Sequence, residues 1–179
     1  MESFRSLLQH RRSVREFKAD PVEEDTVDAL LEAALLAPTA KNRRPWHFLV
    51  VDKKDDLQSL AKCKPHGADF LADAPLAIVI GADSAQASAW IEDASIAAII
   101  LQLAAEEHGL GSCWIQIRGR SAPDGGGADD FVRRQLSIPE ETEVEAIIAL
   151  GYPAVSPEPH DLRKLPYERV HFGRFGRSR

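Results

Sequence analysis

The residues with the clearest chemical capability lie near the N-terminus, in the stretch HRRSVREF from His10 to Phe17. A guanidinium group presents paired donors that fit a phosphate, and a neighbouring hydroxyl adds a short hydrogen bond. The stretch therefore suits a phosphomonoester, while a solvated basic turn paired with the acids of the next helix would explain the same residues. The side chains concerned are Arg11, Arg12, Ser13 and Arg15.

A second polar stretch, LAPTAKNRRPWHFLVV, begins where Pro38 is expected to end a helix. It leads through a short loop that contains Thr39 and Asn42 into an apolar run that starts at Trp46. Loops of this kind place hydroxyl and amide groups at the edge of a sheet. There these groups could hydrogen-bond a planar heterocycle, so the loop is a second candidate part of a binding site.

Two segments have the pattern of helices that would support these stretches. Val22 to Ala37 has acids in its first turn and one apolar stripe, which is typical of an amphipathic helix. Ser88 to Gly109 is apolar almost all round and ends in His108 and Gly109, which are C-terminal signals. The second helix is therefore predicted to be buried, either in the core or in a dimer interface.

Short apolar runs between these helices predict strands. Trp46 to Asp52 and Pro75 to Asp83 read as central strands, covered on both faces. Gly111 to Arg118 and Glu143 to Tyr152 supply two more strands, separated by a Gly-rich loop and the helical stretch ADDFVRRQL. The pattern indicates an α+β fold with helices packed on a mixed sheet, followed by a tail that is predicted to wrap the surface or a partner subunit.

Composition limits the class of protein. With 179 residues, 44% of them hydrophobic and 28% charged, the chain is expected to form one soluble domain over residues 1–179. The formal net charge of -6 argues against a nucleic-acid surface. The N-terminus lacks the order of a signal peptide, and no apolar run approaches the roughly 18 residues of a membrane helix, so a cytoplasmic location without a membrane partner is expected.

Several catalytic classes lack their motifs. The GxG in HGLGSCW precedes a strand instead of following one, which is the wrong order for a dinucleotide-binding loop. No P-loop, GxSxG or HExxH motif occurs, and the six histidines never fall at ligand spacing, so no metal site is predicted. Cys63 and Cys113 form no CxxC pair and are expected to be buried free thiols.

Four motifs in order along the chain resemble the FMN-dependent nitroreductase family: RRS-x-R-x-F, AP-[ST]-x-x-N-x-x-PW-x-F, GLG-[ST]-CWI and ALGYP. The resemblance implies a mixed, mainly antiparallel central sheet flanked by helices, in an interlocked homodimer with FMN at the subunit interface. It also implies electron transfer from NADH or NADPH through FMN to a nitroaromatic, quinone or related small acceptor by a ping-pong mechanism. The alternatives are a flavin-binding carrier or sensor without turnover and, against the charge balance, a nucleic-acid binder.

The resemblance also implies roles for individual residues. The first motif would hold the FMN phosphate and flavin edge, the second motif would reach the flavin from the other subunit, and the strand that contains GSCWIQ would run beside the ring. A basic residue near the C-terminus would close on the phosphate. Because the cofactor performs the redox chemistry, no catalytic side chain is predicted. The implied cofactor-binding residues are Arg11, Arg12, Ser13, Arg15, Thr39, Asn42, Trp114, Ile115, Gln116, Arg163 and Lys164.

The sequence departs from the family pattern at two places. Arg44 stands where many relatives carry Gln, which adds positive charge near the expected cleft and predicts a preference for anions. Gln116 stands where some members have Glu, so a negative contact at the pyrimidine side of the ring is expected to be missing, with a slightly raised flavin potential. The loop from Gly125 to Gly127 is the expected lid.

Overall fold

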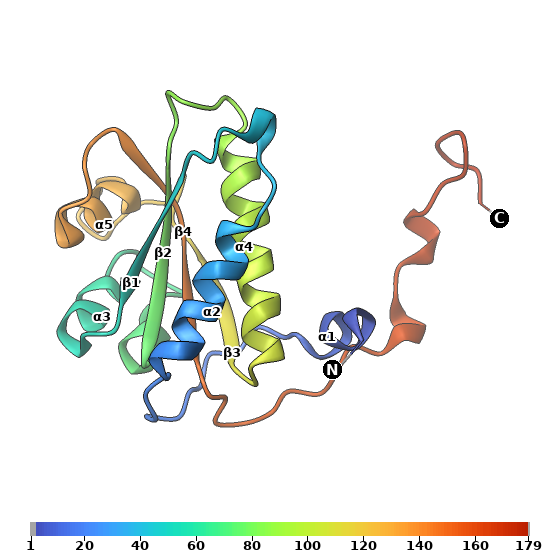
Figure 1. Ribbon diagram of the computed structural model, residues 1–179, viewed down its shortest axis with the longest axis horizontal. Coiled ribbons are helices and arrows are strands. Elements are labelled where there is room, and N and C mark those ends of the chain that lie inside the picture. The colour runs from blue at the N-terminus through green and yellow to red at the C-terminus, as the bar shows by residue number, and fades with distance from the viewer. Residues whose placement is uncertain (1–2, 179) are drawn as a thin grey trace.

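A single four-stranded sheet organises the chain, for which a computed structural model describes residues 3–178 (Figure 1). The strand order is β1-β2-β4-β3, and neighbouring strands pair antiparallel. A parallel contribution comes from an isolated bridge between Ser13 and Ser112. The α+β prediction with a mainly antiparallel sheet is therefore confirmed. The strands are β1 Trp46–Val51, β2 Leu76–Asp83, β3 Gly111–Gln116 and β4 Thr142–Gly151.

Helices cover both faces of this sheet, with α2 and α4 on one face and α3 and α5 on the other (Figure 1). The short helices α1 and α3 were not expected from the sequence, because seven residues carry too little periodicity to be recognised. Within residues 3–178, none of the helices is long and apolar enough to cross a membrane. The α-helices are α1 Phe4–His10, α2 Glu24–Leu35, α3 Lys54–Leu60, α4 Trp90–Glu107 and α5 Ala128–Leu136, and the short 3-10 turns are η1 Ala40–Asn42, η2 Asp69–Asp73, η3 Leu162–Lys164 and η4 Tyr167–Arg169.

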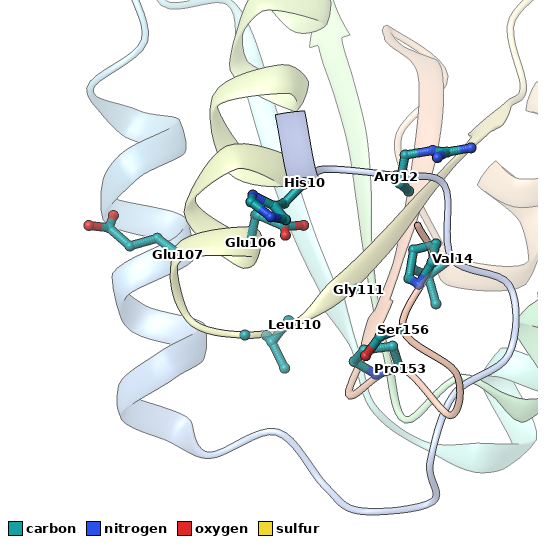
Figure 2. Close-up of a pocket in the computed structure, with 11 residues that line it drawn as sticks. His10, Arg12, Val14, Glu106, Glu107, Leu110, Gly111, Pro153 and Ser156 are labelled. Atoms are coloured by element: carbon teal, nitrogen blue, oxygen red, sulfur yellow. The ribbon is translucent and has the colours of Figure 1, made fainter. Parts of the chain in front are cut away.

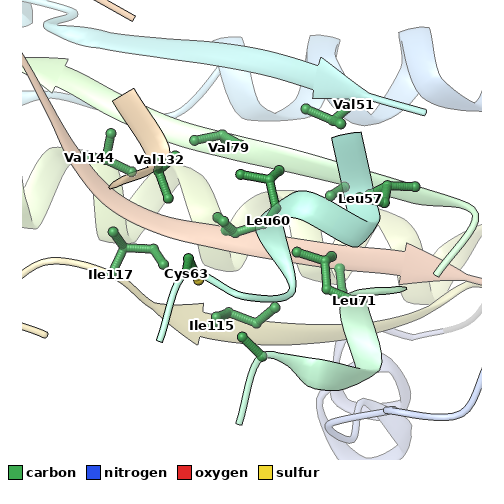
Figure 3. Close-up of a cluster of buried hydrophobic side chains, with 14 of the residues drawn as sticks. Val51, Leu57, Leu60, Cys63, Leu71, Val79, Ile115, Ile117, Val132 and Val144 are labelled. Carbon is green, nitrogen blue, oxygen red and sulfur yellow. The ribbon is translucent and has the colours of Figure 1, made fainter. Parts of the chain in front are cut away.

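The two faces of the sheet bury separate apolar cores. Successive residues of a strand point to opposite faces, so Ile147 of β4 packs toward α3 and α5 while its neighbour Ile148 packs toward α2 and α4. Figure 3 shows the first of these cores, in which Leu60 of α3 and Val132 of α5 meet Ile115 of the sheet. The helices are thereby held firmly against β3 and β4, the strands that border the candidate site.

One prediction about the strands is wrong. β2 lies between two neighbours, as expected, but β1 is an edge strand in this chain. Leu49 is 38% exposed and Val50 is 37% exposed, so the run Trp46 to Asp52 is not covered on both faces. An apolar run indicates that a strand contacts apolar surface. It does not indicate whether the strand has neighbours on one side or on both sides in the sheet.

The C-terminal tail leaves the body after β4. Figure 1 shows it running beyond α1 and away from the sheet. Its first part is tied to α1, since the side chain of Gln9 donates to the carbonyl oxygen of His160 at 3.2 Å and the backbone N–H of His160 donates to the carbonyl oxygen of Gln9 at 2.9 Å. The tail therefore does not contribute to the core of its own chain.

Candidate cofactor site

The basic stretch after α1 lies extended along the outer edge of β3. The backbone N–H of Val14 donates to the carbonyl oxygen of Ser112 at 2.9 Å, next to the Ser13–Ser112 bridge. Gly111 permits this close approach, because a Cβ atom there would lie 2.7 Å from the Cβ of Val14. Gly111 in the third motif thus docks the first motif against the sheet, although the two are about a hundred residues apart in the chain.

Alternation along this extended stretch groups three of the four predicted side chains around Cys113. Positions 11, 13 and 15 alternate with Arg12 and Val14 along the extended stretch, and the guanidinium carbon of Arg15 lies 5.9 Å from the centroid of the Phe70 ring, which packs on the core formed with α3 and α5. The alternation therefore puts Arg11, Ser13 and Arg15 on one side of the stretch. Burial raises the pKa of the Cys113 thiol on the same side, and the charges of Arg15 and Arg11 lower it.

Arg12 is not part of this group. Its guanidinium group donates to the backbone carbonyl oxygen of Glu158 in the tail. It also lines a cavity of about 520 Å³ at the C-terminal end of α4, together with His10 and Glu106 (Figure 2). The phosphate contact of Arg12 stays a prediction, and in this chain its guanidinium group holds the start of the tail.

Lys64 is a further cation on the Cys113 side, and the sequence patterns did not indicate it. Its Nζ donates to the carbonyl oxygen of Gln116 at 3.3 Å, and its charge also lowers the pKa of Cys113. A hollow of about 380 Å³ beside it is lined in part by Ser121, which is bridged to Gly127 of the predicted lid loop. No motif spacing marks Lys64, because its turn comes near β3 only through the packing of α3.

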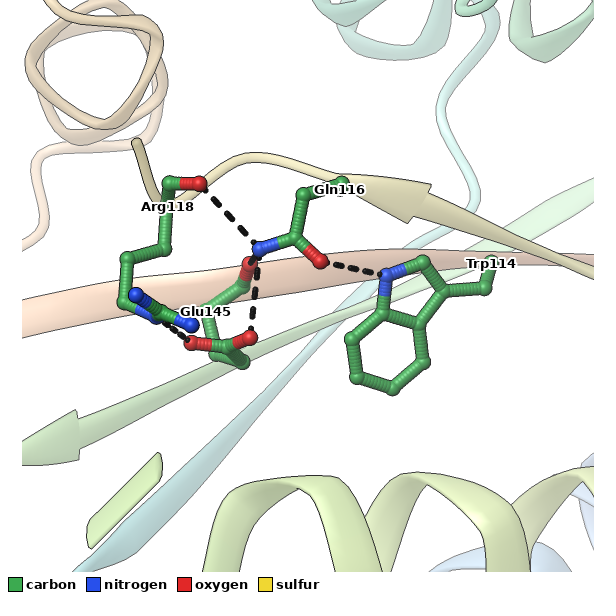
Figure 4. A network of polar contacts seen from close by, with 4 residues as sticks. All are labelled: Trp114, Gln116, Arg118 and Glu145. Atoms are coloured by element: carbon green, nitrogen blue, oxygen red, sulfur yellow. Dashed lines mark hydrogen bonds and ion pairs between the residues drawn. The ribbon is translucent and has the colours of Figure 1, made fainter. Parts of the chain in front are cut away.

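The side chain of Gln116 is fully engaged within the protein (Figure 4). Its Oε1 accepts a hydrogen bond from Trp114 Nε1 at 2.9 Å, and its Nε2 donates to Glu145 Oε1 at 3.2 Å and to the carbonyl oxygen of Arg118 at 3.2 Å. What Gln116 can offer to a ligand is therefore its backbone, as the resemblance implied. The network also fixes the amide orientation, because each end of the amide has a distinct partner.

Glu145 supplies a carboxylate next to Gln116. Because Gln116 stands where some members of the family have Glu, we expected a negative charge to be missing there. Glu145 is buried on β4, and its Oε2 is 2.5 Å from Nε of Arg118. A buried carboxylate is stable when it is paired and hydrogen-bonded in this way. An acid inside the apolar run EVEAIIALG was the signal in the sequence that could have revealed it.

The neighbouring predictions on β3 differ in outcome. Trp114 is half-buried on the α4 side, where it contacts the core formed with α2 and α4. Ile115 is fully buried in the opposite core, labelled in Figure 3. The side chain of Ile115 therefore cannot line an open site together with Trp114, and only its backbone lies along the strand edge.

The loop that contains Thr39 and Asn42 lies at the other end of α4. The backbone N–H of Ala40 donates to Oδ1 of Asp93, in the first turn of α4, at 2.8 Å. Arg12, by contrast, shares its cavity with Glu106 near the end of the helix. At about 1.5 Å per residue, the 13 steps from Asp93 to Glu106 span roughly 20 Å. A single chain therefore does not bring Thr39 and Asn42 next to the Arg11 to Arg15 stretch.

The tail carries the two late basic residues, Arg163 and Lys164. They lie in η3 of the tail, where Arg163 donates to both carboxylate oxygens of Asp161 at 3.0 and 2.9 Å. These hydrogen bonds hold the pKa of Asp161 below its ordinary value. The guanidinium group of Arg163 is thus paired within the tail, and its predicted contact with the cofactor stays a prediction.

Both cysteines are buried free thiols, as predicted. Burial raises the pKa of Cys63 to about 11. Since the thiolate is the reactive form, we expect neither thiol to react readily with Ellman's reagent at pH 8 in the native protein, and both to react in guanidinium chloride. Rapid modification of a native thiol would contradict the buried placement.

Comparisons with known proteins agree on one family. The profile described as Nitroreductase family matches residues 8–66 and 58–152. A solved structure of an FMN-dependent nitroreductase from Clostridium difficile R20291 superposes with a TM-score of 0.93 at 47% identity, covering 94% of this chain and 98% of that one. A protein of Methanothermobacter thermautotrophicus named "Putative NADH dehydrogenase/NAD(P)H nitroreductase" is 36% identical over 92% of this chain and 83% of its own length. The "NADH dehydrogenase" of Thermus thermophilus is 29% identical, over 89% of this chain and 90% of its own.

Proposed function

The chain belongs to the nitroreductase family, and we propose from this premise that it is an FMN-dependent oxidoreductase that oxidises NADH or NADPH and reduces a nitroaromatic, quinone or related small acceptor in ping-pong order. Bound FMN supplies the redox chemistry, namely hydride acceptance and electron delivery. The protein supplies binding, orientation and the electrostatic environment. The observation that carries this proposal is that the stretch with Arg11, Ser13 and Arg15 is docked on the outer edge of β3, with Lys64 hydrogen-bonded to Gln116 of the same strand.

The residues at this edge fit an anionic, planar cofactor. Arg11 and Arg15 can donate to phosphate oxygens and Ser13 can add a hydroxyl donor. Lys64 places an ammonium group beside the carbonyl oxygen of Gln116, at the strand edge along which the flavin would lie. A cation at this position would favour the extra negative charge of the reduced cofactor. No side chain in this arrangement is needed as a general acid.

The network of Figure 4 keeps this strand edge rigid. Because Trp114 and Glu145 hold opposite ends of the Gln116 amide, rotation of that side chain would break several hydrogen bonds at once. The edge of β3 is thus preorganised for a ligand, which lowers the entropic cost of binding.

We infer that the complete site needs two copies of the chain. Thr39 and Asn42 lie about one helix length from the Arg11 to Arg15 stretch, so antiparallel packing of two α4 helices about a two-fold axis would bring the loop of one copy to the basic stretch of the other. Large apolar side chains on α1 and α4 and at the C-terminal end of α2 are exposed in the isolated chain, which favours such an interface. They are Phe4, Leu8, Leu35, Leu36, Ile96 and Ile99.

The tail supports the same assembly. It extends away from its own body (Figure 1) and exposes further apolar side chains, among them Tyr167, Val170 and Phe175. In a dimer, the partner subunit would cover these side chains. Arg163 and Lys164 of the tail could then reach the cofactor bound by that partner subunit. Sedimentation velocity is expected to give a dimer for the full chain, whereas a monomer that binds FMN at full affinity would contradict the shared site.

The proposed function is tested by reducing the purified protein without oxygen. We expect the protein to show a flavin absorbance spectrum, or to acquire one with added FMN, and to bleach on addition of NADH or NADPH. Stopped-flow mixing of the reduced protein with an acceptor should then restore the oxidised spectrum in a separate half-reaction, as ping-pong order requires. A flavin that stays oxidised would instead indicate a carrier or sensor, and a protein that takes up no FMN would overturn the proposal.

The loop beside the proposed flavin site has a strong positive charge, because Lys41, Arg43 and Arg44 are all exposed. We therefore expect Arg44→Gln to raise KM for 4-nitrobenzoate up to about fivefold, the effect of an exposed charge pair of up to about 1 kcal/mol. KM for the neutral 4-nitrobenzyl alcohol should stay the same. Steady-state kinetics at low salt measure the difference, and equal changes for both acceptors would contradict selection by charge.

A further inference from the structure

A buried carboxylate lies beneath the loop that contains Thr39 and Asn42. Asp93 is 2% exposed, and its Oδ1 accepts the backbone N–H of Ala40 at 2.8 Å. Within residues 3–178 it forms no ion pair with a lysine or arginine. Carboxylates are rarely buried without such a partner, because their desolvation is costly. Packing alone therefore does not explain an aspartate at this position.

The loop above Asp93 has an unfavourable backbone. Lys41, Asn42 and Arg44 have φ values of 54°, 54° and 50°, in the left-handed region that non-glycine residues rarely adopt. Two hydrogen bonds act inside the loop, from the Arg44 backbone N–H to Thr39 Oγ1 at 3.0 Å and from Arg44 Nε to Asn42 Oδ1 at 3.1 Å. The hydrogen bond of Ala40 to Asp93 joins the loop to α4 and so fixes where Thr39 and Asn42 point.

Two buried polar atoms below the loop have no hydrogen-bond partner among residues 3–178. They are Oδ2 of Asp93 and Nε1 of Trp46, the residue at which β1 begins. Trp46 packs against Ala97, one helical turn after Asp93 on α4. Unpaired buried groups cost folding stability and tend to persist where they serve a function. Asp93 lies in the first turn of α4, directly bonded to the loop that carries Lys41, Arg43 and Arg44.

We propose that Asp93 is a positioning residue for the cofactor: by anchoring Ala40, it holds the strained loop from Thr39 to Arg44 in the shape that presents Thr39 and Asn42 to the flavin bound by the partner subunit. This inference rests on the proposed function. It assigns a role to the first turn of α4, where neither a motif nor the resemblance placed a site residue. Asp93 itself does not need to touch the cofactor.

The first test needs no cofactor. Hydrogen exchange of the FMN-free protein should show the Ala40 amide exchanging at least about tenfold faster in Asp93→Ala than in the wild type, because the acceptor is lost. Asp93→Asn keeps an oxygen that can accept the Ala40 N–H and should restore most of the protection. Glu92→Ala is the matched control, since it removes an exposed acid from the same helical turn. Unchanged protection of Ala40 in Asp93→Ala would overturn the anchoring role.

The second test measures binding. We expect Asp93→Ala to raise the Kd for FMN about tenfold, Asp93→Asn to return it to within about threefold, and Glu92→Ala to leave it unchanged. The visible circular dichroism of bound flavin should change in Asp93→Ala, because the contacts of Thr39 and Asn42 change. The contrary outcomes can be told apart. If the wild type binds FMN and Asp93→Ala binds it equally well with the same spectrum, only this inference fails.

If Asp93→Ala and Asp93→Asn lose FMN affinity by the same factor, and their melting temperatures fall to the same extent, Asp93 acts in folding and the positioning role is overturned. If the wild type takes up no FMN, the proposed function fails, while the exchange result still decides the anchoring.

Discussion

Replacing Arg11 with alanine is expected to weaken FMN binding by about 1.5–3 kcal/mol, the range for a hydrogen bond to a charged group, which corresponds to roughly 10- to 150-fold in Kd. The reason is geometric as well as electrostatic. Arg11 alternates with Arg12 along the extended stretch that is docked on β3, so it shares a side with Ser13 and Arg15, and Lys64 is hydrogen-bonded to the same strand. Titration of the FMN-free protein, followed by quenching of flavin fluorescence, gives the two dissociation constants directly.

Arg12→Ala is the matched control for Arg11→Ala. The substitution removes the same charge from the next residue. In the wild type, however, the guanidinium group of Arg12 is hydrogen-bonded to the carbonyl oxygen of Glu158, on the other side of the stretch. We expect its Kd for FMN to change by less than about threefold, the size of a screened charge effect at moderate salt. Unchanged binding in Arg11→Ala would remove Arg11 from the site. Equal losses in both variants would mean that net positive charge matters and that the side of the strand does not.

Replacing Ile148 with alanine is expected to lower the free energy of unfolding by about 2–5 kcal/mol, the range for truncating a large buried aliphatic side chain. Ile148 lies on β4, between β2 and β3, and is fully buried against the layer formed by α2 and α4. The cavity would open at the centre of the sheet, where paired strands on both sides restrict relaxation. Urea unfolding followed by circular dichroism measures the loss.

Leu49→Ala tests whether this cost comes from burial. Leu49 lies on the edge strand β1 of the same sheet and is 38% exposed, so its truncation should cost less than about 1.5 kcal/mol. The two variants remove similar numbers of carbon atoms, and the comparison therefore isolates the environment. A loss in Leu49→Ala as large as that in Ile148→Ala would mean that β1 is covered in solution by another part of the assembly.

Much of the fold could be predicted, because the burial of its longer helices and strands is visible as a local pattern of apolar residues. The stripe in Val22 to Ala37 and the apolar length of Ser88 to Gly109 correspond to α2 and α4, with boundaries that differ by two residues at each end. All four strands were expected close to their observed limits. The short helices α1 and α3 were not, and β1 was wrongly expected to be central, because pairing partners come from distant parts of the chain.

The candidate site was predicted less evenly. Arg11, Ser13 and Arg15 share one side of the stretch docked on β3, and the side chain of Gln116 is engaged within the protein, while their contacts with a cofactor stay predictions. Lys64 and Asp93 were missed, because each becomes relevant only through packing of a distant segment. Thr39 and Asn42 are not brought next to the first motif within one chain. Their contacts with the cofactor, and those of Arg163 and Lys164, stay predictions.

The amino-acid sequence by itself determined the family, the class of fold and the residue types of an anion site, because periodicity, turn chemistry and motif spacing act over a few neighbouring residues. Only the tertiary structure decided which side of the stretch each arginine occupies, that Glu145 lies beside Gln116, and that the loop with Thr39 and Asn42 lies at the opposite end of α4 from Arg12. The physical reason is that such adjacencies depend on strand register and helix packing. Strand register and helix packing depend on how residues from the whole chain are buried together in the two cores. They therefore cannot be read from any short stretch of the sequence.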